Sequence, residues 1–236
     1  MNKRQILPPV QHEAAPLRRK IYATLREAIE SGQLRAGDRL VEKDICRDLG
    51  VSRTSLREAL RELETEGLLV NHPARGLTVA RMTLHEARNI YRLRGALEVL
   101  AAEQFTERAT SDQMRSLRDS TEVLEKAYET GDIAGMIAAK TSFYDKLCAG
   151  AQNPEILDTL RRLNSRINLL RRGSLSGPNR LSQSISEIKA LVSALERGDV
   201  EAARQAAAVH VSNAAIAGLK GLEDDELGLA DERNKQ

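Results

Sequence analysis

Residues 42–67 read EKDICRDLGVSRTSLREALRELETEG, and this stretch decides the fold. We predict two helices that meet at a tight turn at Gly50. The second helix begins after Ser52, a residue type that caps helix N-termini, and stops at Gly67, a residue type that ends helices. One face of this second helix is apolar and is predicted to be buried, at Leu56, Ala59, Leu60 and Leu63.

A second stripe of the same helix is basic, with Arg53, Arg57 and Arg61 four residues apart. Like charges at this spacing destabilise a helix by about 0.2–0.5 kcal/mol per pair, so the stripe favours an external partner. Phosphate groups and guanine edges are such partners, because arginine binds both with two parallel hydrogen bonds. The alternative is a solvated face with glutamates of the same helix as partners. The short helix and turn that precede the stripe favour DNA.

The composition bounds the class of protein. The 236 residues have room for two domains, and aromatic residues make up only 3%, which favours helix packing over strands. Residues 1–80 hold 14 Lys/Arg against 11 Asp/Glu, a modest excess that fits a DNA-contacting N-terminal domain. No apolar run is long enough to cross a bilayer, and no signal peptide is visible. We therefore predict a cytoplasmic protein without a membrane partner.

The segment before the helix pair divides into an arm and a helix. Residues 1–15 show no hydrophobic period, which predicts a flexible N-terminal arm. Pro16 is typical of a first helical position, and apolar residues recur at helical spacing until Gly32. We predict that this helix opens an N-terminal domain of residues 16–82.

Two short β-type runs follow the helix pair, at residues 68–70 and 77–80. The loop between them contains Pro, Gly and two side chains that can carry positive charge. A small hairpin directly after a DNA-reading helix is a wing. Residues 16–82 are therefore predicted to form a winged helix-turn-helix domain.

Residues 83–220 are predicted to form a second, all-helical domain. Thr83 and Glu86 make a capping box, and Gly-Asp and Asn-Pro pairs separate the later helices. Short connections between helices of this length favour an antiparallel bundle. We expect a disordered acidic tail at residues 221–236. The six predicted helices span residues 84–108, 112–129, 133–149, 154–172, 180–197 and 200–219.

The run GQLRAGDRLVEKDICRDLGVSRTSLREALRELETEGLL at residues 32–69 and the wing PARGLTV at 73–79 resemble GntR-superfamily transcription regulators of the FadR type, which carry a C-terminal FCD effector domain. The resemblance covers roughly residues 17–219 and places the helix-turn-helix at about 42–61. It implies a mainly α fold, with a winged helix-turn-helix followed by an all-α effector-binding and dimerisation bundle. Ala36 and Ser55 stand where the family often has Pro, a mild departure.

The resemblance also implies which residues contact double-stranded DNA. Arg57 and Arg53 would read bases in the major groove, Arg39 and Lys43 would bind phosphates, and the wing would reach the minor groove or the backbone. The DNA-binding residues predicted in this way are Arg39, Lys43, Arg53, Thr54, Ser55, Arg57, Arg61, His72, Arg75 and Gly76.

FCD domains commonly hold a metal ion between helices with one Asp and three His, and three of those positions differ here. Lys140 stands at the Asp position, Tyr144 and Ile188 stand at two His positions, and only His210 is retained. An ammonium group and an aliphatic side chain offer no lone pair to a divalent cation. We therefore predict no metal and no other cofactor. Lys140 alone carries about the charge of a carboxylate with a divalent ion, so attraction for an anion can remain.

Arg94 matches the arginine that reaches the effector in this family. Lys140 and Tyr144 lie one helical turn apart and face the same way. The predicted ligand-binding residues are therefore Arg94, Lys140, Tyr144 and His210, around a small organic anion. The alternative also stands, in which His210 is a structural core residue and the ammonium group of Lys140 reaches solvent.

The resulting functional prediction is a ligand-responsive transcriptional regulator, a repressor or an activator, that binds a palindromic operator as a homodimer. The alternative is a constitutive DNA-binding dimer whose effector site has decayed. An enzyme is not predicted, because the four histidines are scattered and no nucleophile, carboxylate cluster or phosphate loop is present. Cys46 and Cys148 have no companion at metal-ligand spacing and are predicted to be reduced and structural.

Overall fold

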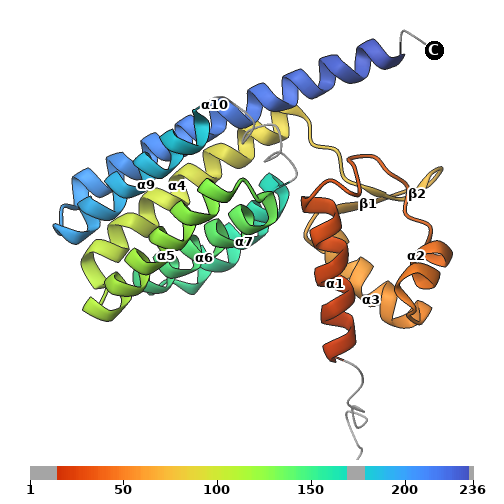
Figure 1. The fold of residues 1–236 in the computed structure, drawn as a ribbon, viewed down its shortest axis with the longest axis horizontal. Coiled ribbons are helices and arrows are strands. Elements are labelled where there is room, and N and C mark those ends of the chain that lie inside the picture. Colours follow the sequence, from red (N-terminus) through yellow and green to blue (C-terminus); the bar gives the residue numbers. More distant parts are fainter. Residues whose placement is uncertain (1–14, 169–178, 234–236) are drawn as a thin grey trace, which may run out of the picture.

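The computed structural model describes residues 15–168 and 179–233. Figure 1 shows two parts, a small N-terminal domain in red to yellow-orange and a bundle of long helices in yellow to blue. The predicted N-terminal arm up to residue 14, the predicted helical residues 169–172 and the last three residues lie outside the described part.

The N-terminal domain is a winged helix-turn-helix, as predicted. Gly50 has a left-handed φ of 64° between the first two helices of the motif, which gives the tight turn. Ser52 Oγ accepts a hydrogen bond from the backbone N–H of Ser55, as expected for a cap. The elements are α1 (Ala15–Glu30), α2 (Glu42–Leu49), α3 (Arg53–Thr65), β1 (Leu69–His72) and β2 (Gly76–Val79).

The core of this domain lies between α1, α3 and the hairpin. The four residues of α3 predicted to be buried, Leu56, Ala59, Leu60 and Leu63, are the four that the structure buries. β1 and β2 pair antiparallel from Leu69 opposite Val79 to His72 opposite Gly76. The hairpin is thereby fixed directly after the recognition helix α3.

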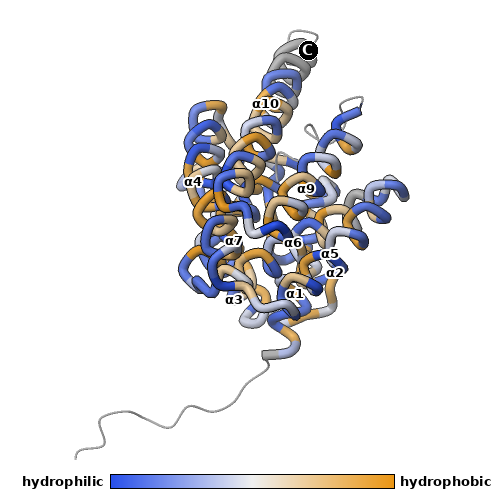
Figure 2. The backbone as a smooth tube through the Cα atoms, turned by 90° about the vertical axis from the view of Figure 1, so that its left-hand side faces the viewer, coloured by the Kyte–Doolittle hydropathy of each residue, from blue (hydrophilic) through white to orange (hydrophobic). Residues whose placement is uncertain are grey.

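The second part is a helical bundle that follows the predicted boundaries closely. Thr83 caps α4 in a capping box with Glu86, and Asp132 caps α6. Figure 2 shows orange hydrophobic and blue hydrophilic segments alternating along the helices, as amphipathic packing requires. The bundle helices are α4 (Leu84–Arg108), α5 (Ser111–Thr130), α6 (Ile133–Ala151), α7 (Pro154–Asn168), α9 (Arg180–Glu196) and α10 (Val200–Arg233).

The predicted disordered tail is wrong for residues 221–233, which continue α10 to Arg233. The stretch contains three Glu and three Leu, which are good helix formers, although it also contains three Asp and two Gly, which are poorer ones. Leu222 also packs against a buried cluster that contains Met82 and Tyr91, so the helix is held beyond residue 220. The acidic composition alone predicts disorder, whereas the apolar contact of Leu222 favours a helix. In the described residues, no helix has the length and apolar character needed to cross a membrane.

The two parts touch where the end of α7 meets α1. Arg26 Nη2 donates a hydrogen bond of 2.9 Å to Ser165 Oγ, and Asn168 Nδ2 donates one of 2.7 Å to Glu30 Oε1. The winged helix-turn-helix domain is therefore joined to the bundle by polar contacts as well as by the chain.

Candidate DNA-binding surface and buried polar cluster

The recognition helix α3 presents its basic stripe to solvent. Arg53, Arg57 and Arg61 are exposed, as is Thr54, while Ser55 is half-buried. The same helix buries its apolar face in the domain core, so the two faces predicted from the sequence are separated as expected.

Arg57 is held by a carboxylate of the neighbouring helix. Its Nε lies 2.9 Å from Glu42 Oε2 and 3.1 Å from Glu42 Oε1, and Glu42 is the first residue of α2. Side-chain exposures of 60% for Arg57 and 36% for Glu42 limit the worth of this ion pair to about 1 kcal/mol or less. DNA can therefore replace Glu42 as the partner of Arg57. Sequence reasoning missed this pair, because the two residues lie on different helices.

The other predicted DNA-binding residues lie on α2, on the segment before it and on the wing. Arg39, Lys43, His72 and Arg75 are exposed. Gly76 opens β2 with a positive φ of 73°, and a Cβ placed there would lie 4.0 Å from Arg39 Nε. Arg39 is thus brought beside the wing. The role of these residues at DNA stays a prediction.

The four predicted ligand-binding residues lie in the interior of the bundle, on three helices. Arg94 of α4, Tyr144 and Lys140 of α6, and His210 of α10 are between 1% and 6% exposed. Arg94 Nη2 donates a hydrogen bond of 2.6 Å to the hydroxyl of Tyr144. Arg94 Nε donates to Glu98 Oε1 in a buried ion pair between residues one turn apart.

Lys140 lies on the side of this cluster that faces α9. Its Nζ is 3.5 Å from Ser184 Oγ, and the Tyr128 hydroxyl is 3.3 Å from the same oxygen. Ile188, one turn further along α9, is fully buried in the apolar core. The three positions that differ from the metal-binding pattern therefore face one region, and they supply it with an ammonium group, a phenol and a hydrocarbon.

His210 is held by Glu187 of α9. Nδ1 of His210 lies 2.7 Å from Glu187 Oε2, and Glu187 also receives two hydrogen bonds from Arg180 and one from Asn213. Burial opposes the charge of Glu187, but hydrogen bonds from His210, Arg180 and Asn213 lower its pKa to about 2. Glu187 is therefore a carboxylate and accepts a hydrogen bond from the Nδ1–H group, which leaves His210 Nε2 as an acceptor. Within the described chain, this Nε2 has no hydrogen-bond partner.

Basic side chains outnumber carboxylates by one in this cluster. Burial, with Lys140 nearby, lowers the pKa of His210 to about 3, so the imidazole is neutral at pH 7. Burial also opposes the charge of Arg94, yet the Glu98 carboxylate and Tyr144 raise the pKa of Arg94 above its ordinary value. Arg94, Lys140 and Arg180 thus face two carboxylates, Glu98 and Glu187, with a sum of +1.

The residues of this cluster do not fit a divalent metal ion. His210 offers one nitrogen, but Lys140 offers a cation and Ile188 offers no donor atom. Among the described residues, no group of three His, Cys, Asp or Glu side chains lies in an arrangement that could hold a metal.

Four cavities of the described residues have neither Arg94 nor Lys140 in their walls. One of ≈ 190 Å³ lies between the two parts and has Arg26, Glu66, Tyr144 and Ser165 among its wall residues. Sequence reasoning also missed two carboxylates of the cluster, Glu98 and Glu187. Glu98 had a signal, because it lies four residues after Arg94 on a helix. Glu187 had only a weak signal, because Arg180 lies two turns away on the same helix while His210 and Asn213 come from α10.

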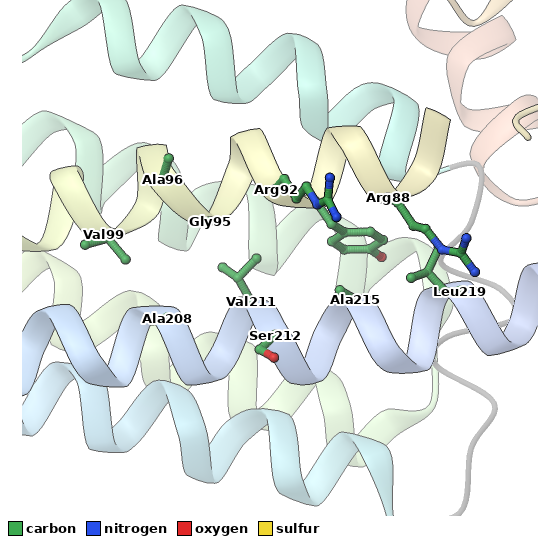
Figure 3. Close-up of a pocket in the computed structure, with 11 residues that line it drawn as sticks. Arg88, Arg92, Gly95, Ala96, Val99, Ala208, Val211, Ser212, Ala215 and Leu219 are labelled. Carbon is green, nitrogen blue, oxygen red and sulfur yellow. The ribbon is translucent and has the colours of Figure 1, made fainter. Parts of the chain in front are cut away.

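A groove of ≈ 460 Å³ runs along the outer face of α4 and α10 (Figure 3). Its wall is formed by small and aliphatic side chains, such as Ala96 and Val211, with Arg88 and Arg92 towards one end. Large hydrophobic side chains are exposed on the same two helices, at Leu93, Leu100, Val209 and Ile216. Apolar surface of this extent on two adjacent helices is typical of a surface that another protein covers.

Two family models match the two parts. Residues 17–79 match "Bacterial regulatory proteins, gntR family", and residues 89–213 match "FCD domain". The boundaries of both matches agree with the division between the winged domain and the bundle.

Curated relatives and solved structures agree with these matches. The HTH-type transcriptional regulator YdhC of Bacillus subtilis is 27% identical, over 82% of this chain and 87% of its own length. A probable D-xylose utilization operon transcriptional repressor of Paenarthrobacter nicotinovorans is 31% identical, over 78% of this chain and 80% of its own length. The solved structure of McbR/YncC of Escherichia coli superposes with a TM-score of 0.75 at 26% identity, covering 88% of this chain and 98% of that one.

All of these proteins are transcriptional regulators and none is an enzyme, in agreement with the prediction. The match to the FCD domain alone covers more than half of the chain. The winged helix-turn-helix, the bundle behind it and both family matches lead to one conclusion: the chain belongs to the gntR family of bacterial regulatory proteins and is a DNA-binding transcriptional regulator with an FCD domain.

Proposed function

We propose that this regulator binds a palindromic operator as a homodimer in the cytoplasm. We also propose that a small organic anion binds in the bundle without a metal ion and changes the affinity of the protein for DNA. The buried polar cluster carries the proposal. Three basic side chains, Arg94, Lys140 and Arg180, stand against two carboxylates, Glu98 and Glu187, in the interior of the bundle. A buried net charge is costly, and one bound carboxylate would neutralise it.

DNA would be read by two copies of the winged domain. The stripe of α3 is exposed along more than two helical turns, from Arg53 to Arg61, and the hairpin of β1 and β2 follows α3 directly in the chain. Two such units related by two-fold symmetry read two half-sites, which is why the operator is proposed to be palindromic.

The groove along α4 and α10 is the proposed dimer surface. The groove is apolar and open. Both helices that form it belong to the bundle, and α3 belongs to the other domain (Figures 1 and 3). Sedimentation or light scattering of Ala96→Glu would test it, because Ala96 is exposed in the groove and a glutamate there would bury a charge in the dimer. A monomer is expected. Val123→Glu, at an exposed position of α5, is the matched control and should stay dimeric.

The constitutive dimer is the second candidate, and one observation favours it. Arg94 already has Glu98 and Tyr144 as partners, and four cavities of the described residues do not reach Arg94 or Lys140. If the bundle binds nothing, its charges are a structural network and the domain serves dimerisation alone.

Calorimetry and thermal unfolding with a panel of small mono- and dicarboxylates would separate the two candidates. The anion hypothesis predicts that at least one carboxylate raises the melting temperature of the wild type and loosens or tightens its operator complex. Lys140→Met should lose that response, since it keeps an unbranched side chain of similar volume and removes the charge. Lys146→Met, at an exposed position of the same helix, should keep it. A wild type that responds to no carboxylate would support the constitutive candidate.

A further inference from the structure

Arg94 and Glu98 form a buried ion pair in the bundle interior. Both residues are 1% exposed, and Arg94 Nε donates to Glu98 Oε1. Only one oxygen of the Glu98 carboxylate is used in this way. Within the described chain, Oε2 of Glu98 is buried and accepts no hydrogen bond.

This arrangement leaves the Glu98 carboxylate only half satisfied. A buried acceptor without a hydrogen bond costs about 1–3 kcal/mol, and more when it is charged. The Arg94 guanidinium, in contrast, depends on an anion, because removal of one partner from a buried ion pair leaves an uncompensated charge. Arg94 thus requires an anionic partner, but the carboxylate of Glu98 makes only half of the hydrogen bonds that it could accept from the protein.

Glu98 can leave Arg94 without moving a helix. The two residues lie one turn apart on α4, so a change of the Glu98 side-chain torsions is enough to separate the charges. The charge of Glu98 also acts on a residue of α6. Burial first, and then the charge of Glu98, raise the pKa of the Cys148 thiol to about 12. The cavity between the two parts has Cys148 and Tyr144 in its wall, so that side of Glu98 and Arg94 has free volume nearby.

We propose that the Glu98 carboxylate is a built-in occupant of the anion position at Arg94, and that an effector carboxylate binds by displacing it. This inference rests on the anion site proposed above. A plain monocarboxylate only exchanges one carboxylate for another at Arg94, with little gain in free energy. An effector must therefore add a second contact, for example with Lys140, so Glu98 acts as a specificity-determining residue that excludes simple carboxylates.

Chemical rescue tests the proposal with acetate as the probe. Glu98→Ala removes the carboxylate and leaves space for acetate, which carries the same group. The melting temperature of this variant should fall in sodium chloride. In sodium acetate of equal ionic strength it should rise again by about 2–4 °C, the response expected for about 1 kcal/mol in a protein of this size. The wild type should show no difference between the two salts.

Two control variants identify Arg94 as the receptor of acetate. Arg94→Met/Glu98→Ala has neither charge and should show no acetate response. Glu103→Ala removes a carboxylate from the surface of the same helix, where it pairs with Arg204, and should behave as the wild type in both salts. An acetate response of equal size in the double variant would overturn the proposal, as would a Glu98→Ala variant that is as stable as the wild type in chloride.

Folding failure is also informative. If Glu98→Ala folds in acetate but not in chloride, the proposal is supported. If it folds in neither salt, Glu98→Ser, which also leaves space beside Arg94, is tested with formate, the smallest carboxylate, and the lack of a formate-specific shift overturns the proposal. These outcomes are independent of the effector test, because rescue can succeed in a chain that binds no natural effector. Conversely, wild type can respond to a carboxylate through Lys140 while Glu98→Ala shows no rescue, which overturns only the role of Glu98.

Discussion

Arg26 of α1 donates a hydrogen bond of 2.9 Å to Ser165 of α7, and this contact connects the DNA-binding domain with the effector domain. Arg26 Nη1 also donates to the Tyr22 hydroxyl, and that hydroxyl donates to Glu66 directly after the recognition helix. The cavity beside this chain of contacts has Tyr144 in its wall. Since Tyr144 binds Arg94, a change at Arg94 has a short physical route to the end of α3.

Ser165→Ala is expected to loosen this junction. The variant removes a hydrogen bond from a charged donor, so we expect a loss of about 1 kcal/mol in the free energy of unfolding. The urea transition, followed by circular dichroism, should also become less steep, because the two domains unfold less cooperatively. Ser186→Ala, at an exposed position of α9, should change neither quantity. A transition of unchanged midpoint and slope for Ser165→Ala would show that the contact does not couple the domains.

Arg57→Ala is expected to reduce the preference for the operator over random DNA by about 1–3 kcal/mol, the worth of a good base contact. Fluorescence anisotropy on both DNA sequences at one salt concentration measures this preference. Arg204→Ala, on the surface of α10, is the control and should leave it unchanged. Equal losses on operator and random DNA would mean that Arg57 holds phosphate only.

Glu42→Gln gives a separate prediction about the same arginine. In the free protein Arg57 has to leave Glu42 before it binds DNA, and an exposed ion pair is worth about 0.2–1 kcal/mol. The variant should therefore bind operator up to about five-fold more tightly, an effect that disappears in Arg57→Ala/Glu42→Gln. Weaker binding of Glu42→Gln would instead indicate that Glu42 positions Arg57 for DNA.

The order and bounds of the helices could be predicted because caps and stops are local signals. Thr83 with Glu86, and Ser52 with Ser55, are satisfied within one helical turn. The buried face of α3 was equally accessible, since it follows from spacing alone. The tail after residue 220 was missed for a different reason: its stability as a helix depends partly on Leu222 packing against the bundle, which composition does not reveal.

The candidate site could be predicted only in part. The resemblance brought Arg94, Lys140, Tyr144 and His210 together, and the structure places all four in the bundle interior. Their partners required three-dimensional information. Glu187, which holds His210, lies on a different helix, 23 residues away in sequence.

Metal removal is expected to have no effect on this protein. Lys140, Tyr144 and Ile188 replace three donors, so EDTA should leave the melting temperature and operator affinity unchanged, and added Zn²⁺ or Mn²⁺ should not raise the melting temperature. The triple variant Lys140→Asp/Tyr144→His/Ile188→His is the comparison and should gain a metal-dependent rise. One tightly held metal ion per chain in elemental analysis of the wild type would contradict this prediction.

Stability of the bundle is expected to fall in mild acid because of His210. Its pKa is about 3 in the folded protein and 6.5 ordinarily, so below pH 6.5 the unfolded chain binds a proton that the folded chain does not. Stability from this group is fully present above pH 6.5 and is lost as the pH falls. At pH 5 the loss is about 2 kcal/mol, from 1.36 kcal/mol per pH unit. Glu187, with its pKa lowered to about 2 from 4.5, adds a further loss only below about pH 4.5.

His210→Asn separates this effect from other titrations. Asparagine can place an N–H near the position of Nδ1 and donate to Glu187, but it does not titrate. The free energy of unfolding of the variant, measured in urea between pH 5 and pH 7.5, should therefore be about 2 kcal/mol less dependent on pH than that of the wild type. His85→Asn, at an exposed position of α4, should keep the slope of the wild type. An unchanged slope in His210→Asn would mean that His210 binds its proton in the folded state as readily as in the unfolded state. That result would contradict a neutral His210 imidazole in the folded protein.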